Sequence, residues 1–464
     1  MPDRAAEGSI PTGRVRRVVP LAGLAARSAG DSVLAALQGR RSDPELYVRR
    51  AERYVELLGR SKGALMKMGQ VMSFIPFGAG LSPENREVFQ ASMARLQASA
   101  PPMAPGLVDE VIAAELGGPA SQVFAEFSPE PIAAASIGQV HRARLDDGRE
   151  VAVKVQYPGV AEAIADDLAN TELMAVFFQL LRSVIPGIAK GDPRKVSADL
   201  AASITAELDY TREAADQAAF AEFYRDHPFI RIPDVVPERS TRRVLTQDYL
   251  DGVDLPTATK ADQALRYRWS EILFRFYYSN MRDLGLVNAD PHPGNYLFRT
   301  DGTVGFLDFG SVIRLAPGDS EQVFALFRAT MRQDAKALMA AMVAGKVFWQ
   351  GDRIDPADVL AWYSALFDGI TGPQPMCMSP EDARRWVEYY SPTGPFGKVM
   401  RSVRAADDAV LKERIDLGVR AVMAELRPCA DWRAILSEYT DDADPATEPG
   451  RAHWAWRATQ HAQL

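Results

Sequence analysis

The sequence predicts an α+β protein in which a small antiparallel sheet is followed by a helical lobe, with a helical extension in front. Strand-like alternation of apolar residues is concentrated between residues 131 and 155, where Asp146-Asp147-Gly148 marks a hairpin turn. Helical periodicity fills most of residues 42–97, 160–223 and 261–440. With 464 residues, 47% of them hydrophobic, the chain is long enough for about three structural units at roughly 150 residues each.

Turn residues and local composition divide the chain into five expected segments. Three prolines near residue 105 mark the end of the helical extension, and clustered aspartates and prolines mark the last segment as a tail. The segments are a basic N-terminal tail (1–40), a helical extension (41–105), a sheet-containing lobe with a helical insertion (106–252), a helical lobe (253–440) and a loose C-terminal tail (441–464).

Two further strand predictions lie outside the main sheet pattern. A short strand is expected at 243–249, and residues 295–298 and 304–307 read as a hairpin joined by Thr300-Asp301-Gly302. The sheet-containing lobe therefore gains a strand, and the helical lobe carries one small hairpin.

The charge balance argues against a nucleic-acid partner. There are 53 basic and 61 acidic residues, a formal net charge of −8. Residues 1–62 are the basic end, and the arginine-rich apolar pattern at 15–37 suits a helix on an anionic membrane surface. A solvated helix that packs one face on the body of the protein explains the same pattern.

Neither a membrane span nor a disulfide scaffold is expected. The best apolar run, 173–189, is interrupted by Gln179 and Arg182, so we expect no transmembrane helix. Only Cys377 and Cys429 occur, without the spacing of a zinc site. We expect a cytoplasmic protein in a reducing compartment, with any membrane contact peripheral and on the inner face.

A strand lysine is the first candidate functional residue. Lys154 lies in Val151-Ala152-Val153-Lys154-Val155, the pattern in which kinases place the lysine that binds the α- and β-phosphates of ATP. Upstream, where a kinase has a glycine-rich loop, alanines stand instead, which predicts a stiffer loop. Those residues are Ala133, Ala134, Ala135 and Ser136.

Two acidic motifs follow in the helical lobe. Asp290 and Asn295, in Asp-Pro-His-Pro-Gly-Asn, have the five-residue spacing of a catalytic aspartate and a metal-binding asparagine, and Asp308 begins an Asp-Phe-Gly turn. Each motif alone is commonly a simple turn, but their order after a strand lysine predicts phosphoryl-transfer chemistry with Mg²⁺ held by Asn295 and Asp308. His292 has no second histidine within ligand spacing, so we take it as structural.

An acidic segment lies between the two groups of motifs. If residues 207–213 form one helix, Asp209 and Glu213 share a face and Glu207 points elsewhere. Glu213 is then the expected ion-pair partner of Lys154. In the N-terminal extension, Lys67 and Gln70 lie three residues apart and would share a helix face.

Together these motifs resemble the UbiB/AarF family of atypical, protein-kinase-like proteins, over about residues 45–345. The family's KxGQ motif corresponds to Lys67, Gly69 and Gln70, and its ExD motif to Glu207 and Asp209. Its alanine-rich loop, nucleotide lysine, ion-pair glutamate, catalytic aspartate and metal ligands match the residues already named. Many members have histidine where this chain has Asn288 and aspartate where it has Ala98.

The resemblance implies a bilobal protein-kinase-like fold that binds ATP or ADP with Mg²⁺, with Gln247 and Tyr249 at the hinge beside the adenine. It implies an ATPase or phosphotransferase linked to isoprenoid lipids, such as quinones or their precursors, with the KxGQ and ExD residues in a regulatory role. Two alternatives remain open: a nucleotide-gated lipid-binding module without phosphate transfer, and a small-molecule kinase of the aminoglycoside or choline kinase type. Few residues separate Gly310 from the next helix signal at 317–319, so we expect poor activity on protein substrates.

Overall fold

The structure is a computed structural model that describes residues 103–135, 137–169, 205–349, 351–391, 394–403 and 409–461. It divides into two compact units. The sheet unit contains the described residues up to Ala214 together with Val235–Tyr249, and the helical unit contains Ala215–Asp234 and the described residues from Leu250 onward.

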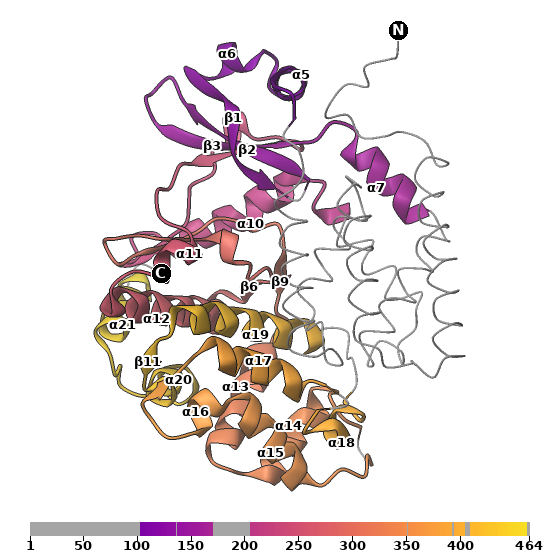
Figure 1. Ribbon diagram of the computed structural model, residues 1–464, viewed down its shortest axis with the longest axis vertical. Coiled ribbons are helices and arrows are strands. Elements are labelled where there is room, and N and C mark those ends of the chain that lie inside the picture. Colours follow the sequence, from indigo (N-terminus) through magenta and orange to yellow (C-terminus); the bar gives the residue numbers. More distant parts are fainter. Residues whose placement is uncertain are drawn as a thin grey trace, which may run out of the picture. The chain divides into compact units, whose positions relative to one another are not determined.

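The sheet unit is built on one four-stranded antiparallel sheet in the order β1-β2-β3-β5. Helix α5 packs against β3 and β5 (Figure 1). The three alternating valines of β3, Val151, Val153 and Val155, point to the same face of the sheet and are buried in a core shared with α5. The strands are β1 (Glu126–Ala135), β2 (Gly138–Arg144), β3 (Glu150–Gln156) and β5 (Val244–Asp248), and the helices are α5 (Pro105–Leu116), α6 (Ala120–Val123), α7 (Val160–Ala169) and the start of α10 (Tyr210–Phe223).

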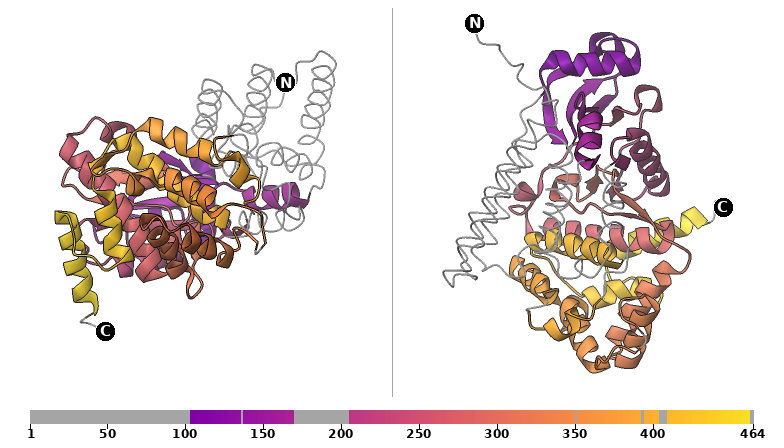
Figure 2. Two further views of the ribbon diagram at one scale, coloured as in Figure 1. Left: turned by 90° about the horizontal axis from the view of Figure 1, so that it is seen from below. Right: turned by 90° about the vertical axis from the view of Figure 1, so that its right-hand side faces the viewer.

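The helical unit surrounds α12 (Gln263–Ser279), every residue of which is buried from Trp269 to Ser279. Along this buried stretch α12 packs against α19, α21 and β8. Helix α21, drawn in yellow, runs toward the end marked C in both views of Figure 2. The unit also contains the short helix α11 (Leu255–Ala258) and the strands β4 (Ile230–Arg231), β6 (Leu286–Asn288), β7 (Tyr296–Phe298), β8 (Val304–Phe306), β9 (Val312–Arg314), β10 (Met376–Cys377) and β11 (Cys429–Ala430). The remaining helices are α13 (Asp319–Met331), α14 (Ala335–Ala344), α15 (Pro356–Leu366), α16 (Asp368–Thr371), α17 (Pro380–Tyr389), α18 (Gly397–Met400), α19 (Ala409–Leu426), α20 (Trp432–Thr440) and α21 (Glu448–His461).

Most of the predicted strands are present. The expected hairpin is β7 paired with β8, and the expected short strand is β5. The segment before α13 is short, with only residues 311–318 between Gly310 and that helix. No described helix has the length and hydropathy needed to cross a bilayer.

The expected loose tail at 441–464 is instead largely helical. Helix α21 buries His453 and Trp456, and the indole N–H of Trp454 donates to Glu438 at 2.8 Å. Glu438 in turn holds the buried guanidinium of Arg275 at 2.7 and 3.0 Å. The prediction gave weight to the polar residues at the start of this segment, whereas the burial of the aromatic residues behind them decides the structure.

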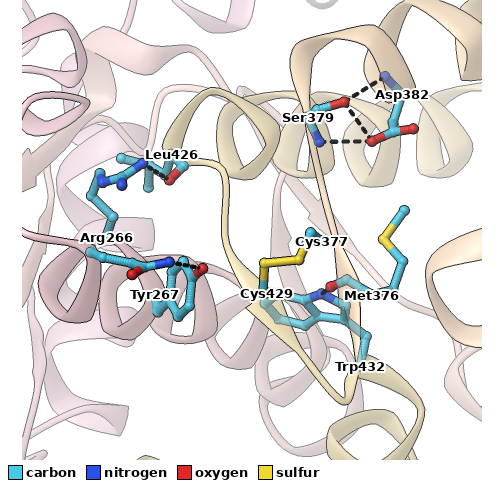
Figure 3. Close-up of a disulfide and its surroundings, with 10 residues drawn as sticks. Arg266, Tyr267, Met376, Cys377, Ser379, Asp382, Leu426, Cys429 and Trp432 are labelled. Atoms are coloured by element: carbon cyan, nitrogen blue, oxygen red, sulfur yellow. Dashed lines mark hydrogen bonds between the residues drawn. A yellow bond between two sulfur atoms is a disulfide. The ribbon is translucent and has the colours of Figure 1, made fainter. Parts of the chain in front are cut away.

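The two cysteines also differ from expectation, because Cys377 and Cys429 form a disulfide that joins β10 to β11 (Figure 3). They lie 52 residues apart in the sequence, directly opposite each other in this two-stranded sheet. The sequence contains too few cysteines to suggest a scaffold, and only the folded chain brings these two together.

Candidate functional site

In the sheet unit, Lys154 on β3 forms an ion pair with Glu213 on α10. The ammonium nitrogen lies 2.8 and 3.0 Å from the two carboxylate oxygens. Both side chains are well shielded, 16% and 6% exposed. The ammonium also lies 5.0 Å from the centre of the Tyr210 ring, close enough for a cation–π contact. The structure therefore brings together the two residues expected to pair, and Glu213 and the Tyr210 ring together hold the ammonium group of Lys154 in place.

The path of the chain before Glu213 differs from the prediction. Glu207 lies in a turn, and α10 begins only at Tyr210. Asp209 accepts hydrogen bonds from the backbone N–H of Thr211 at 3.0 Å and from its hydroxyl at 2.6 Å. An aspartate that bonds the backbone two residues on competes with helix formation and favours a helix start. The prediction of one helix through 207–213 was wrong, so the expected angle between Glu207 and Glu213 does not apply.

The alanine-rich segment is the end of strand β1 rather than a loop. Ala133, Ala134 and Ala135 pair with Val140, Gln139 and Gly138 of β2. Ser136 lies outside the described residues, as do Lys67, Gln70 and Ala98. Glycine is required at 138 because a Cβ there would lie 2.9 Å from the carbonyl carbon of Val155 on β3.

Gln247 shares a face of the sheet with the strand lysine. It pairs with Ala152, while Lys154 pairs with Leu245 two residues away. The side-chain oxygen of Gln247 is buried and has no hydrogen-bond partner among the described residues. A buried acceptor without a partner costs free energy unless a ligand or water supplies a donor.

Tyr249, by contrast, already uses its backbone N–H. That group donates to the carbonyl of Glu150 at 2.9 Å. The Tyr249 ring lies under the guanidinium of Arg142, 4.5 Å from its centre. The backbone N–H of Tyr249 is therefore engaged within the sheet unit.

In the helical unit, residues 288–295 form a loop held by its own polar side chains. We call it the Asp290 loop. The side-chain amide of Asn295 donates to the carbonyl and the carboxylate of Asp290, at 3.1 and 3.0 Å. Because its nitrogen is engaged, the Asn295 amide presents its oxygen as the atom able to bind a cation. His292 accepts from the backbone N–H of Gly294 at 3.0 Å, which fits the structural role expected of it.

Asn288 joins this loop to the Asp-Phe-Gly turn. Its amide nitrogen donates to the carbonyl of Asp308 at 2.7 Å, and its amide oxygen accepts from the backbone N–H of Asp290 at 3.0 Å. The short pairing of β6 with β9 brings the two segments side by side. The amide of Asn288 therefore connects the backbones of both predicted acidic residues, a role visible only once the fold is known.

The Asp-Phe-Gly turn has its own support. The carboxylate of Asp308 accepts from the N–H of Gly310 at 2.9 Å. Phe309 is fully buried, with its ring centre 4.7 Å from that of Phe220. Burial and the neighbouring Asp290 charge raise the pKa of the Tyr296 phenol well above its usual value, so this phenol stays protonated.

The oxygen donors present are those that Mg²⁺ prefers, namely carboxylates and an amide oxygen. No group of three or more histidine, cysteine, aspartate or glutamate side chains that could hold a metal occurs in the described ranges.

The fold and these motifs define a protein-kinase-like protein. Residues 95–342, more than half of the chain, match the ABC1 atypical kinase-like domain, and the chain belongs to that family.

Curated relatives resemble the chain over much of its length. Rat atypical kinase COQ8B, mitochondrial, is 35% identical over 67% of this chain and 58% of its own length. The probable protein kinase UbiB of Marinobacter nauticus is 34% identical over 60% of this chain and 52% of its own. The first curated relatives are longer proteins, of which the chain spans between about a third and three fifths. Among solved structures, Rv3197 of Mycobacterium tuberculosis, in complex with erythromycin, is 28% identical with a TM-score of 0.59, covering 88% of this chain and 98% of its own.

Proposed function

We propose that this chain binds Mg-ATP and acts as an atypical kinase or ATPase connected with isoprenoid quinones or related lipids. The observation that carries the proposal is the bridge made by Asn288, which ties Asp290 of the predicted catalytic loop to Asp308 of the predicted metal-binding turn. If each motif were only a turn whose aspartate forms hydrogen bonds within that turn, no side chain would be needed to connect the two. The lipid connection draws on the family resemblance, with relatives named COQ8B and UbiB.

Each residue has a definite chemical task in this proposal. Lys154, oriented by Glu213, neutralises phosphate charge. The buried side-chain oxygen of Gln247 accepts a hydrogen bond from the base of the nucleotide. Asp308 and the oxygen of Asn295 hold Mg²⁺, which when bound neutralises the charge that develops on the transferred phosphoryl group. Asp290 accepts the proton of the attacking hydroxyl or water.

Nucleotide binding is tested first. Lys154→Ala and Asp308→Asn should each abolish the rise in melting temperature that Mg-ATP produces in the full chain. Lys398→Ala and Asp358→Asn are matched controls, because they break an exposed ion pair of 2.6 Å in the helical unit. Unchanged shifts in both site variants would refute the proposal.

Labelled ATP separates the four possible functions. Wild type is incubated with γ-labelled ATP, with and without vesicles that contain a quinone precursor. Label on an acceptor indicates a kinase, and free phosphate indicates an ATPase. Nucleotide binding with neither product would favour the alternative, a lipid-binding module gated by nucleotide. Transfer to small hydroxylated molecules in place of the lipid would favour a small-molecule kinase.

The basic N-terminal segment, residues 1–62, is the proposed site of peripheral contact with an anionic membrane. Sedimentation with anionic and neutral vesicles tests it. Equal binding to both would contradict the electrostatic contact.

A further inference from the structure

Helix α19 lies beyond the matched family domain, yet it touches the Asp290 loop at one glycine. A Cβ placed on Gly418 would overlap the Cγ of Pro291, and it would lie 3.0 Å from the Cβ and 3.7 Å from the Cδ of the same ring. Real Cβ atoms do not approach another carbon so closely, because dispersion turns to repulsion well before that distance. The backbone of α19 therefore rests directly on the residue that follows Asp290.

The helix cannot easily withdraw from this contact, because it is anchored on both sides of Gly418. Asp416 and Arg420 form a buried ion pair of 2.7 Å, two residues before and two residues after the glycine. Asp416 also accepts from the hydroxyl of Tyr278 at 3.2 Å, and Arg420 donates to the carbonyl of Leu366 at 2.7 Å. The ion pair itself lies within α19, but moving the helix away would break the hydrogen bonds to Tyr278 and Leu366 and leave buried charged side chains without these partners. A displacement of α19 is therefore resisted at this point.

The C-terminal end of α19 is held as well. Arg266 on α12 donates to the carbonyl of Leu426 at 2.9 Å, and three residues later Cys429 is tied to Cys377 (Figure 3). Figure 3 shows both links at the end of the helix. Because the helix is fixed at its end and in its middle, an added methyl group at 418 would move the Asp290 loop instead.

We propose that Gly418 is a positioning residue for Asp290, and that α19 is the support against which the Asp290 loop is set. The inference rests on the proposed phosphoryl-transfer function, in which Asp290 must meet the attacking group. Displacement of a reacting group by about 1 Å can cost about a hundredfold in rate. The nearest atoms to a Cβ at 418 all belong to Pro291, so the effect of the substitution is expected to pass through that residue.

The test is a set of four full-length proteins: wild type, Gly418→Ala, Pro291→Ala and the double variant. Gly106→Ala is the control, because a Cβ there meets nothing within 4 Å. Phosphate release gives kcat and KM for ATP, and amide hydrogen exchange is followed over residues 288–296, which needs no nucleotide. Gly418→Ala should lower kcat at least about tenfold with little change in KM, and should speed exchange in the Asp290 loop.

Removing the proline ring should remove the effect. In the Pro291→Ala background, adding Gly418→Ala should change kcat by less than about threefold, because the nearest atom of the ring is gone. Wild-type kcat and exchange in Gly418→Ala would overturn the proposal, and so would a further loss of about tenfold or more when Gly418→Ala is added to Pro291→Ala.

Failure to fold also decides between outcomes. If Gly418→Ala does not fold, a folded double variant supports the steric contact and an unfolded one refutes it. If wild type releases no phosphate, the proposed function fails, while the exchange measurement still tests whether Gly418 positions the loop.

Discussion

Replacing Asn288 by alanine removes both hydrogen bonds that connect Asp290 to Asp308. A net contribution of about 1 kcal/mol for each bond gives about 2 kcal/mol in total. Asn288 is half-buried, so water can partly replace the lost partners, and we expect unfolding to become easier by about 1–2 kcal/mol. If the same 2 kcal/mol is lost from the transition state, kcat falls about thirtyfold.

Two further substitutions at this position separate the two bonds. Asn288→Asp keeps an acceptor for the N–H of Asp290 but has no donor for the carbonyl of Asp308, because an ionised carboxylate only accepts. Asn288→His can donate with one ring nitrogen and accept with the other, and therefore should retain more activity than alanine.

Steady-state phosphate release at saturating ATP, over a range of Mg²⁺ concentrations, is the appropriate assay. The aspartate variant should require more Mg²⁺, since the Asp308 side of the bridge is the one it loses. If Asn288→Ala turns over ATP within about twofold of wild type, the bridge has no part in setting the two aspartates, and the estimated thirtyfold loss of kcat is refuted.

Three other predictions concern stability and specificity. Burial, with Arg275 nearby, lowers the pKa of His453 from 6.5 to about 3. The neutral imidazole therefore contributes stability that is present above pH 6.5 and is lost as the pH falls toward 3, with about 2 kcal/mol lost by pH 5. Urea unfolding at pH 7.5 and at pH 5 should show this loss of unfolding free energy. The His453→Gln variant should show a smaller difference between the two pH values. Reduction of the Cys377–Cys429 disulfide, which closes 52 residues, should lower the unfolding free energy by up to about 4 kcal/mol, a loss that Cys377→Ser should reproduce without reductant. Unrelated peptides should accept little label from ATP, since only residues 311–318 follow Gly310 before α13; efficient labelling of several would contradict this.

The parts of the fold that could be predicted depend on short-range patterns. Alternating valines identified β3, and turn residues between two apolar runs identified the β7–β8 hairpin. The pairing of Lys154 with Glu213 could be anticipated because the spacing of motifs implied their chemistry. In each case the information lies within a few residues, or in a motif whose function requires a particular partner.

The features that were missed depend on distant partners. The break before α10 follows from the bonds that Asp209 makes to Thr211, which compete with a helix. The helical structure within 441–461 depends on the burial of Trp456 and on the Glu438–Arg275 pair, neither of which a local pattern reveals. The need for glycine at 418 comes from Pro291, 127 residues earlier in the chain.

The Asp290 loop is constrained from two independent sides. Asn288 holds the backbone N–H of Asp290 by a hydrogen bond, and α19 meets the next residue, Pro291, by direct contact at Gly418. A polar bond sets direction but yields easily, whereas a steric contact blocks movement on one side without setting direction. If both act on the same aspartate, the change in activation free energy of the double variant Asn288→Ala, Gly418→Ala, calculated from kcat, should differ from the sum of the two single changes. Residues that share a partner are coupled in this way. Strict additivity of the two losses would mean that α19 and the bridge act on different steps.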